Sequence, residues 1–188
     1  MDYSQPDFYR FSEDSIGLVK FANSFLPQSK SFDILDLCAG SGVIALEFAQ
    51  LRPVNKIVFV EVQDEFIPHL KRNAENFFKH EYEIVHAPLS QFTHALKPDI
   101  IFSNPPYFAT TANLISPNKN KAICRSFVID SLEILFQTVG KQLEVGGYFF
   151  LVHIEPPDYF FTLSHKYNLD IKSSQKFKTC HLICFVRL

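Results

Sequence analysis

The feature that most constrains the fold is an alternation of short apolar segments with longer stretches of helical periodicity. Seven segments rich in β-branched and aromatic residues are predicted strands: 32–37, 56–61, 82–87, 99–103, 148–153, 170–174 and 179–187. Helices are predicted between them at 43–51, 64–79, 127–143 and 157–166. This alternation predicts an α/β fold with a mostly parallel seven-stranded sheet and helices on both faces. The short connection between the last two strands predicts a C-terminal antiparallel hairpin.

The length of 188 residues predicts a single domain over 1–188. Its first part, 1–30, is predicted to be a helical segment, because Ile16, Val19 and Ala22 recur at helical spacing behind a polar start. No apolar run reaches the roughly 18 residues that a membrane helix needs. The N-terminus also lacks the basic and apolar regions of a signal peptide, so a cytoplasmic protein is expected.

Cysteines occur at positions 38, 124, 180 and 184, and without export we expect them to be reduced. Cys180, His181 and Cys184 could suggest zinc. They lie in an alternating segment that is typical of a strand, so no metal is expected. The net charge of −2 is unusual for a nucleic-acid binder, and any such partner would need a local basic patch.

The segment from Ile34 to Leu46 is predicted to be a strand, a glycine-bearing turn and a helix. Gly40 and Gly42 let the backbone approach a ligand, and the following helix offers free N–H groups. The first glycine of a dinucleotide-binding G-x-G-x-x-G turn is replaced by Cys38, and Asp36 ends the strand. This acid would repel a pyrophosphate but could bind a cationic amine.

The next predicted strand ends on Glu61, about 20 residues after the glycines, which is the spacing of an acid that binds ribose hydroxyls. Together these residues indicate a nucleoside that carries an amino acid and no phosphates, and S-adenosylmethionine has this constitution. The structural alternatives are a turn that is merely tight and a glutamate at a solvated strand end.

The fourth strand runs into the sequence SNPPYF, from Ser103 to Phe108. Two consecutive prolines end a strand and hold a rigid, extended corner. At the carboxyl edge of the sheet, the Asn104 side-chain oxygen and the Pro105 carbonyl could accept the hydrogens of an amine, and Tyr107 or Phe108 could stack on a flat base. A proline-rich turn with aromatic packing is the structural alternative.

The segments DLCAGSG, VEVQ and SNPPYF, in this order, resemble class I S-adenosylmethionine-dependent methyltransferases of the N-P-P-Y group, which have a Rossmann-like methyltransferase fold. Members methylate adenine N6 in DNA or RNA, or the glutamine amide of release factors. The resemblance implies that the cofactor is bound by Asp36, Cys38, Ala39, Gly40, Gly42, Glu61, Val62 and Asn104. It also implies a catalytic set of Asn104, Pro105, Pro106 and Tyr107 that holds the target nitrogen.

The later segments AICRSF and EVGGYFFLVHIEPPDYF look like those of the bacterial tRNA1(Val) adenine-N6 methyltransferases. Arg125 matches their pattern, while Ser126 and Phe127 depart from it. The resemblance implies an enzyme whose partner is RNA, tRNA above all. A monomer without a membrane partner is also expected. Expected RNA contacts are Phe108, Arg10, Lys119, Lys121 and Arg125, although charged residues of this kind are often simply solvated.

Other activities stay open at the level of sequence. A release-factor glutamine methyltransferase would be expected to carry a helical N-terminal domain, and a DNA adenine methyltransferase an inserted recognition domain. A catalytically silent cofactor- or RNA-binding module is disfavoured by the intact Asn-Pro-Pro-Tyr motif. It is favoured by the segment 86–89, where related enzymes often carry an acid or amide that contacts the adenine of the cofactor. Pro88 cannot donate a backbone bond there, so this contact would fall to Ser90 or Gln91, and weaker cofactor binding is expected.

Overall fold

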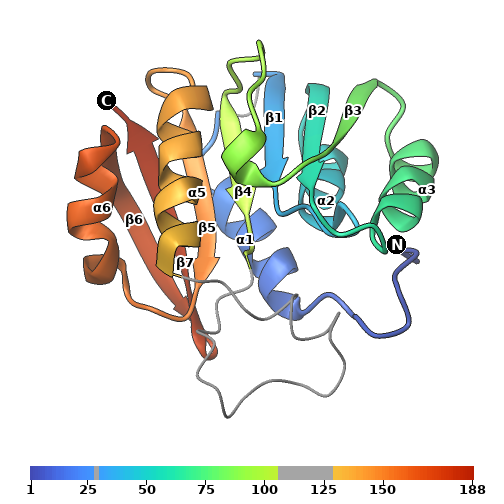
Figure 1. Cartoon of the computed structure of the whole chain (residues 1–188), viewed down its shortest axis with the longest axis horizontal. Coiled ribbons are helices and arrows are strands. Elements are labelled where there is room, and N and C mark those ends of the chain that lie inside the picture. Colours follow the sequence, from blue (N-terminus) through green and yellow to red (C-terminus); the bar gives the residue numbers. More distant parts are fainter. Residues whose placement is uncertain (28–29, 106–128) are drawn as a thin grey trace.

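The computed structural model describes residues 1–27, 30–105 and 129–188. Its centre is a seven-stranded sheet in the order β3-β2-β1-β4-β5-β7-β6 (Figure 1). The strands are β1 (Phe32–Leu37), β2 (Val54–Glu61), β3 (Glu81–His86), β4 (Ile100–Ser103), β5 (Tyr148–His153), β6 (Leu169–Phe177) and β7 (Cys180–Arg187). The first five are parallel, and β7 lies antiparallel between β5 and β6. The predicted parallel sheet with a C-terminal hairpin is confirmed.

The helices are α1 (Glu13–Asn23), α2 (Val43–Leu51), α3 (Ile67–Phe77), α5 (Ile129–Gln142) and α6 (Phe161–Lys166), with 3₁₀ turns η1 (Leu89–Gln91) and η2 (Pro157–Phe160). The single helix predicted over 157–166 is wrong in detail, because η2 precedes α6 as a separate turn. Residues 127–128 of the helix predicted over 127–143 lie outside the described residues. No helix in the described ranges combines the length and the apolar character needed to cross a membrane.

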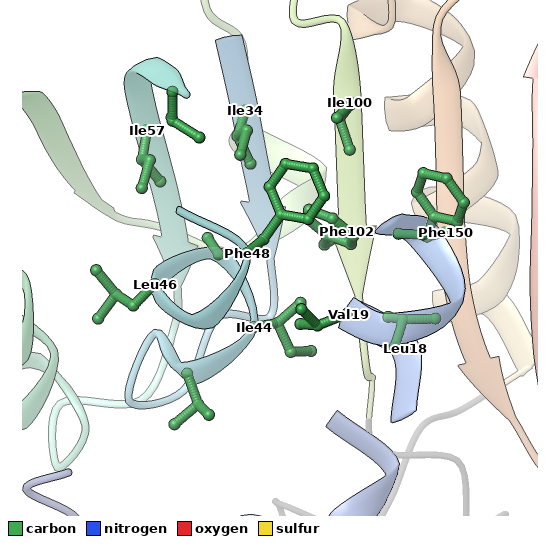
Figure 2. Packing of buried hydrophobic residues seen from close by; sticks show 14 of the residues in the cluster. Leu18, Val19, Ile34, Ile44, Leu46, Phe48, Ile57, Ile100, Phe102 and Phe150 are labelled. Carbon is green, nitrogen blue, oxygen red and sulfur yellow. The ribbon is translucent and has the colours of Figure 1, made fainter. Parts of the chain in front are cut away.

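The sheet is buried on both faces, which explains why its central strands are almost continuously apolar. Ile34 faces the cluster formed with α1, α2 and α3, and its neighbour Leu35 faces the cluster formed with α5 and α6. Figure 2 shows Leu18 and Val19 of α1 beside Phe102 and Phe150 of the sheet. The prediction of helices on both faces is confirmed.

Helix α1 is held at its C-terminal end by Arg52, a buried residue that follows α2. The Arg52 Nη2 atom donates to the carbonyl oxygens of Asn23 at 2.7 Å and Leu26 at 3.1 Å. In the middle of the helix, a Cβ added at Gly17 would come 3.1 Å from the Phe177 ring of the hairpin. Helix α1 is therefore fixed against both α2 and the hairpin.

The strand register brings several strand ends to one edge of the sheet. Leu37 of β1 is level with Val60 of β2 and Ser103 of β4, and Ser103 is level with Leu151 of β5. The parallel strands point the same way in Figure 1, so the residues that follow them meet at this carboxyl edge. Open α/β sheets bind their ligands at such an edge.

Candidate active site

The turn between β1 and α2 has three residues with positive φ: Cys38 at 59°, Gly40 at 54° and Gly42 at 78°. Glycine adopts this backbone conformation without steric cost, whereas the half-buried Cys38 does so under strain. Ala39 closes the turn, since its N–H donates to Val60 O at 3.0 Å and its carbonyl accepts from Gly42 N at 2.8 Å.

The two glycines serve different purposes. A Cβ at Gly42 would lie 2.6 Å from Leu70 and 3.1 Å from Phe59, so this glycine lets the turn pack on α3. Among the described residues, a Cβ at Gly40 would meet Phe66 alone, at an ordinary 3.6 Å. Packing therefore explains Gly42, whereas at Gly40 only the backbone conformation calls for glycine.

Asp36 lies near the carboxyl end of β1 and is only 1% exposed. Its Oδ2 accepts a bond from Ala45 N of α2 at 3.4 Å, but its Oδ1 has no hydrogen-bond partner in the described part of the chain. Burial raises the pKa of this carboxyl well above its usual range, and the negative charge of Glu61 adds to the shift. A buried, unsatisfied carboxylate oxygen is costly unless a cation or donor binds it.

Glu61, at the end of β2, is also buried. Its Oε2 accepts from Gly40 N at 2.7 Å, and its Oε1 accepts from the N–H groups of Val62 and Gln63, each at 2.9 Å. Burial raises the pKa of Glu61, and these three bonds oppose the rise. Glu61 therefore ties β2 to the glycine turn, and Oε2 keeps acceptor capacity for one further donor. Val62 is 52% exposed beside it.

Asn104 directly follows β4 and is half-buried. Its Nδ2 donates to Ser15 Oγ of α1 at 3.2 Å. The preceding Ser103 donates its hydroxyl to Leu37 O at 2.9 Å, which ties the ends of β4 and β1 together. Pro105 is buried. The structure thus brings Asn104 to the same edge as Asp36, one strand away.

Several predicted site residues lie outside the described residues: Pro106, Tyr107, Phe108, Lys119, Lys121 and Arg125. Arg10 is described and exposed, and its Nη1 donates to the carbonyl oxygens of Pro6 at 2.9 Å and Tyr9 at 2.8 Å. The Tyr9 ring packs edge-on against Phe66, the residue beside Gly40, with ring centroids 5.2 Å apart. The N-terminal segment therefore borders the glycine turn.

Sequence reasoning missed Asn73 of α3, which is 1% exposed. Its Nδ2 donates to Ser4 O and Ser41 O, both at 2.9 Å, and its Oδ1 accepts from Ser4 N at 2.9 Å. Asn73 thus joins the N-terminal segment to the glycine turn. A signal was present, because this polar residue follows Leu70 and precedes Ala74 on the buried face of α3.

The segment 86–89, which departs from the family pattern, begins at the last residue of β3 and lies at the same edge of the sheet. Ala87 N donates to Glu61 O at 3.2 Å, and the exposed His86 has its Nε2 3.3 Å from Asp64 Oδ1. Ser90 and Gln91 are exposed in η1. Their contact with adenine stays a prediction.

Cys180 and Cys184 lie in β7, the strand that the alternating sequence predicted, and both are buried. Burial raises the pKa of their thiols to about 11 and about 12, so both stay protonated at neutral pH. Within the described ranges, no group of three or more His, Cys, Asp or Glu side chains could hold a metal ion.

The model of one protein family, described as Conserved hypothetical protein 95, matches residues 18–126. This match covers more than half of the chain, and it includes the glycine turn, Glu61 and Asn104. The chain belongs to the Conserved hypothetical protein 95 family.

Curated proteins also match the chain. A tRNA1(Val) (adenine(37)-N6)-methyltransferase from Pedobacter heparinus is 29% identical over 66% of this chain and 53% of its own length. A release factor glutamine methyltransferase from Mycobacterium leprae is 28% identical over 64% of this chain and 45% of its own. The chain spans about half the length of the curated relatives it matches.

Among solved structures, the 16S rRNA N2 G1207 methyltransferase of T. thermophilus aligns with a TM-score of 0.70 at 22% identity. The alignment covers 95% of this chain and 44% of that one, and that structure holds AdoMet and guanosine. The fold is therefore that of the class I S-adenosylmethionine-dependent methyltransferases, as the sequence predicted.

Proposed function

We propose that the chain is an S-adenosylmethionine-dependent methyltransferase that methylates the exocyclic N6 of adenine in RNA, with tRNA as the substrate class. One observation carries this proposal. Asp36 of β1 is buried and its Oδ1 has no hydrogen-bond partner among the described residues, and Asn104 directly follows the adjacent strand β4 at the same sheet edge. This arrangement supports binding of a cation by Asp36 and of an amine by Asn104.

The residues at the turn fit this cofactor. The unpartnered Asp36 oxygen suits the ammonium group of the amino acid part, and the remaining acceptor capacity of Glu61 suits a ribose hydroxyl. Two buried carboxylates disfavour a pyrophosphate. The lining of the site is assigned to Cys38, Ala39, Gly40, Gly42 and Val62.

When bound, S-adenosylmethionine supplies an electrophilic methyl group. The target nitrogen is a poor nucleophile, because its lone pair is delocalised into the adenine ring. Asn104 Oδ1 and the Pro105 carbonyl accept hydrogen bonds from its two N–H groups, which holds the amine in place and stabilises the positive charge that develops on nitrogen. One of these two protons is then lost to solvent, so that the methylated amine is neutral. By sequence, Pro106 is assigned to a rigid corner, and Tyr107 and Phe108 are assigned to stacking on the base.

The curated relatives named for tRNA support RNA as the substrate class. RNA contacts are assigned to Arg10, Lys119, Lys121 and Arg125. Arg10 presents less of its guanidinium to a phosphate than a fully solvated arginine, because Nη1 is bonded to carbonyls of its own loop.

A protein glutamine is the second candidate, since the Mycobacterium leprae relative is named for release factor glutamine. A glutamine side chain offers the same planar amide nitrogen with two hydrogens, so Asn104 and Pro105 suit both targets.

Transfer of a labelled methyl group from S-adenosylmethionine to total tRNA, followed by nucleoside analysis, tests the proposal. We expect N6-methyladenosine with the wild type and none with Asn104→Ala, whose cofactor affinity should stay within about threefold of the wild type. A parallel reaction with release factors separates the two candidates. Label in the protein and none in tRNA would overturn the RNA assignment.

A further inference from the structure

We propose that Ser15 of α1 is a positioning residue that holds the Asn104 side-chain amide in the orientation needed for methyl transfer. This inference rests on the proposed function, because it gives Ser15 a role through Asn104. The contact joins residues 89 positions apart in the sequence.

The contact is short enough to orient the amide. Asn104 Nδ2 lies 3.2 Å from Ser15 Oγ, and Ser15 is only 4% exposed, so water competes little for this bond. The backbone N–H of Ser15 donates to Ser12 O at 3.2 Å, which fixes Ser15 in the first turn of α1.

Orientation matters because the two ends of the Asn104 amide have opposite chemistry. Oδ1 accepts hydrogen bonds and Nδ2 donates them. An adenine amino group needs an acceptor, and a rotated amide would turn a donor toward its hydrogens. A serine hydroxyl can donate as well as accept, so it could bind either end of the amide. In the structure it is Nδ2 that donates to Ser15 Oγ, which leaves Oδ1 for the target nitrogen.

Contacts with other elements fix the position of α1, and therefore of Ser15. Arg52 binds the carbonyls at its C-terminal end, and Phe177 packs against Gly17, two residues after Ser15. The Glu13 carboxylate at its start also pairs with Lys178 of the hairpin. The position of Ser15 is therefore set, through α1, by Arg52 at the end of α2 and by the β6–β7 hairpin.

The test compares wild type, Ser15→Ala, Ser15→Thr and the control Ser164→Ala. Ser164 is also a buried helical serine, and its hydroxyl donates within α6, to Phe161 O at 3.1 Å. We expect Ser15→Ala to lower kcat by about 10-fold to 100-fold, with cofactor affinity and KM for RNA nearly unchanged. Ser15→Thr, which keeps a hydroxyl, should recover most of kcat, and Ser164→Ala should match the wild type.

A second measurement needs no substrate. The Asn104 side-chain NH₂ signals in a ¹⁵N-correlated NMR spectrum are identified by their loss in Asn104→Ala. In the wild type they should exchange slowly with solvent, and in Ser15→Ala they should exchange faster.

The outcomes separate the two proposals. An active wild type with unchanged kcat in Ser15→Ala, or with unchanged Asn104 exchange, would overturn the role of Ser15 alone. A parallel loss of cofactor affinity in Ser15→Ala would also overturn it, since Ser15 would then act on cofactor binding. A wild type that methylates neither RNA nor protein, despite slow Asn104 exchange, would overturn the proposed function and with it this role.

Discussion

At the scale of single residues, Asp36 is a carboxylate whose burial opposes folding. Its pKa is raised well above the usual range, because burial and the nearby Glu61 charge both disfavour the ionised form. The native state therefore binds this proton more tightly than the unfolded state. The resulting destabilisation is absent below the unfolded pKa of 3.8 and grows as the pH rises toward the folded pKa.

We expect Asp36→Asn to raise the free energy of unfolding of the cofactor-free protein by at least ~1 kcal/mol at about pH 8, and by less at about pH 5. Urea denaturation at both pH values measures this difference. Asp33→Asn, on a half-buried residue of the same strand, is the control and should show no such gain. A loss of stability in Asp36→Asn at about pH 8 would show that the charged form is favourable in the cofactor-free protein.

Gly42 and Gly146 allow the cost of a positive φ to be separated from the cost of a steric clash, since both have φ of 78°. A Cβ at Gly42 would lie 2.6 Å from Leu70, whereas a Cβ at Gly146 would meet nothing within 4 Å. Gly146→Ala should cost about 1 kcal/mol for the backbone conformation alone. Gly42→Ala should cost about 2–4 kcal/mol, because the clash with α3 is added. Chemical denaturation measures both losses of unfolding free energy. Equal losses in the two variants would contradict this prediction, because they would mean that α3 moves aside with no loss of stability.

The sequence predicted where the candidate site residues lie along the chain, but it did not predict the hydrogen bonds they make. Asp36, Glu61 and Asn104 each stand at or just beyond a recognisable strand end, so their common edge was predictable. The three hydrogen bonds from backbone N–H groups to Glu61 could not be predicted, because they depend on the conformation of the turn. The bond between Ser15 and Asn104 has no local sequence signal either.

At the scale of elements, Arg52 holds the C-terminal end of α1 through backbone carbonyls that burial hides from water. Removal of the guanidinium would leave these acceptors unsatisfied. We expect Arg52→Met to lower the free energy of unfolding by about 2–4 kcal/mol, and Arg52→Lys to recover part of the loss.

The control for this experiment is Arg72→Met, on an exposed position of α3, which should change stability by less than about 0.5 kcal/mol. Chemical denaturation of the four proteins measures the differences. A loss in Arg52→Met no larger than in Arg72→Met would contradict the anchoring of α1.

The first and last residues of helices and strands were predicted accurately where the side chains of the element are mostly buried. The bounds of β1, β5 and α2 agree with the predictions, because apolar side chains there are followed by sharp polar or glycine-bearing turns. The strand predicted over 170–174 was too short, since β6 extends over Leu169–Phe177. This edge strand is largely exposed, and a register shift between Ile171 and Ser173 interrupts its alternation, so its apolar signal is weak.

At the scale of the whole molecule, the parallel strands all end at one edge of the sheet. The β6–β7 hairpin, which lies next to β5 in the sheet, packs against α1. The sheet thereby brings a cofactor-binding turn and a target-binding amide together on adjacent strands. The expectations of a single domain, a monomer and a cytoplasmic location stay predictions.

Equilibrium binding of labelled S-adenosylmethionine to wild type, Asp36→Asn and Asp33→Asn tests the cofactor site most directly. We expect one cofactor per chain for the wild type and for Asp33→Asn. We expect an affinity about 10-fold to 100-fold lower for Asp36→Asn, because the charged acceptor for the cofactor amine is lost. No binding to the wild type, or equal binding to wild type and Asp36→Asn, would contradict the site described here.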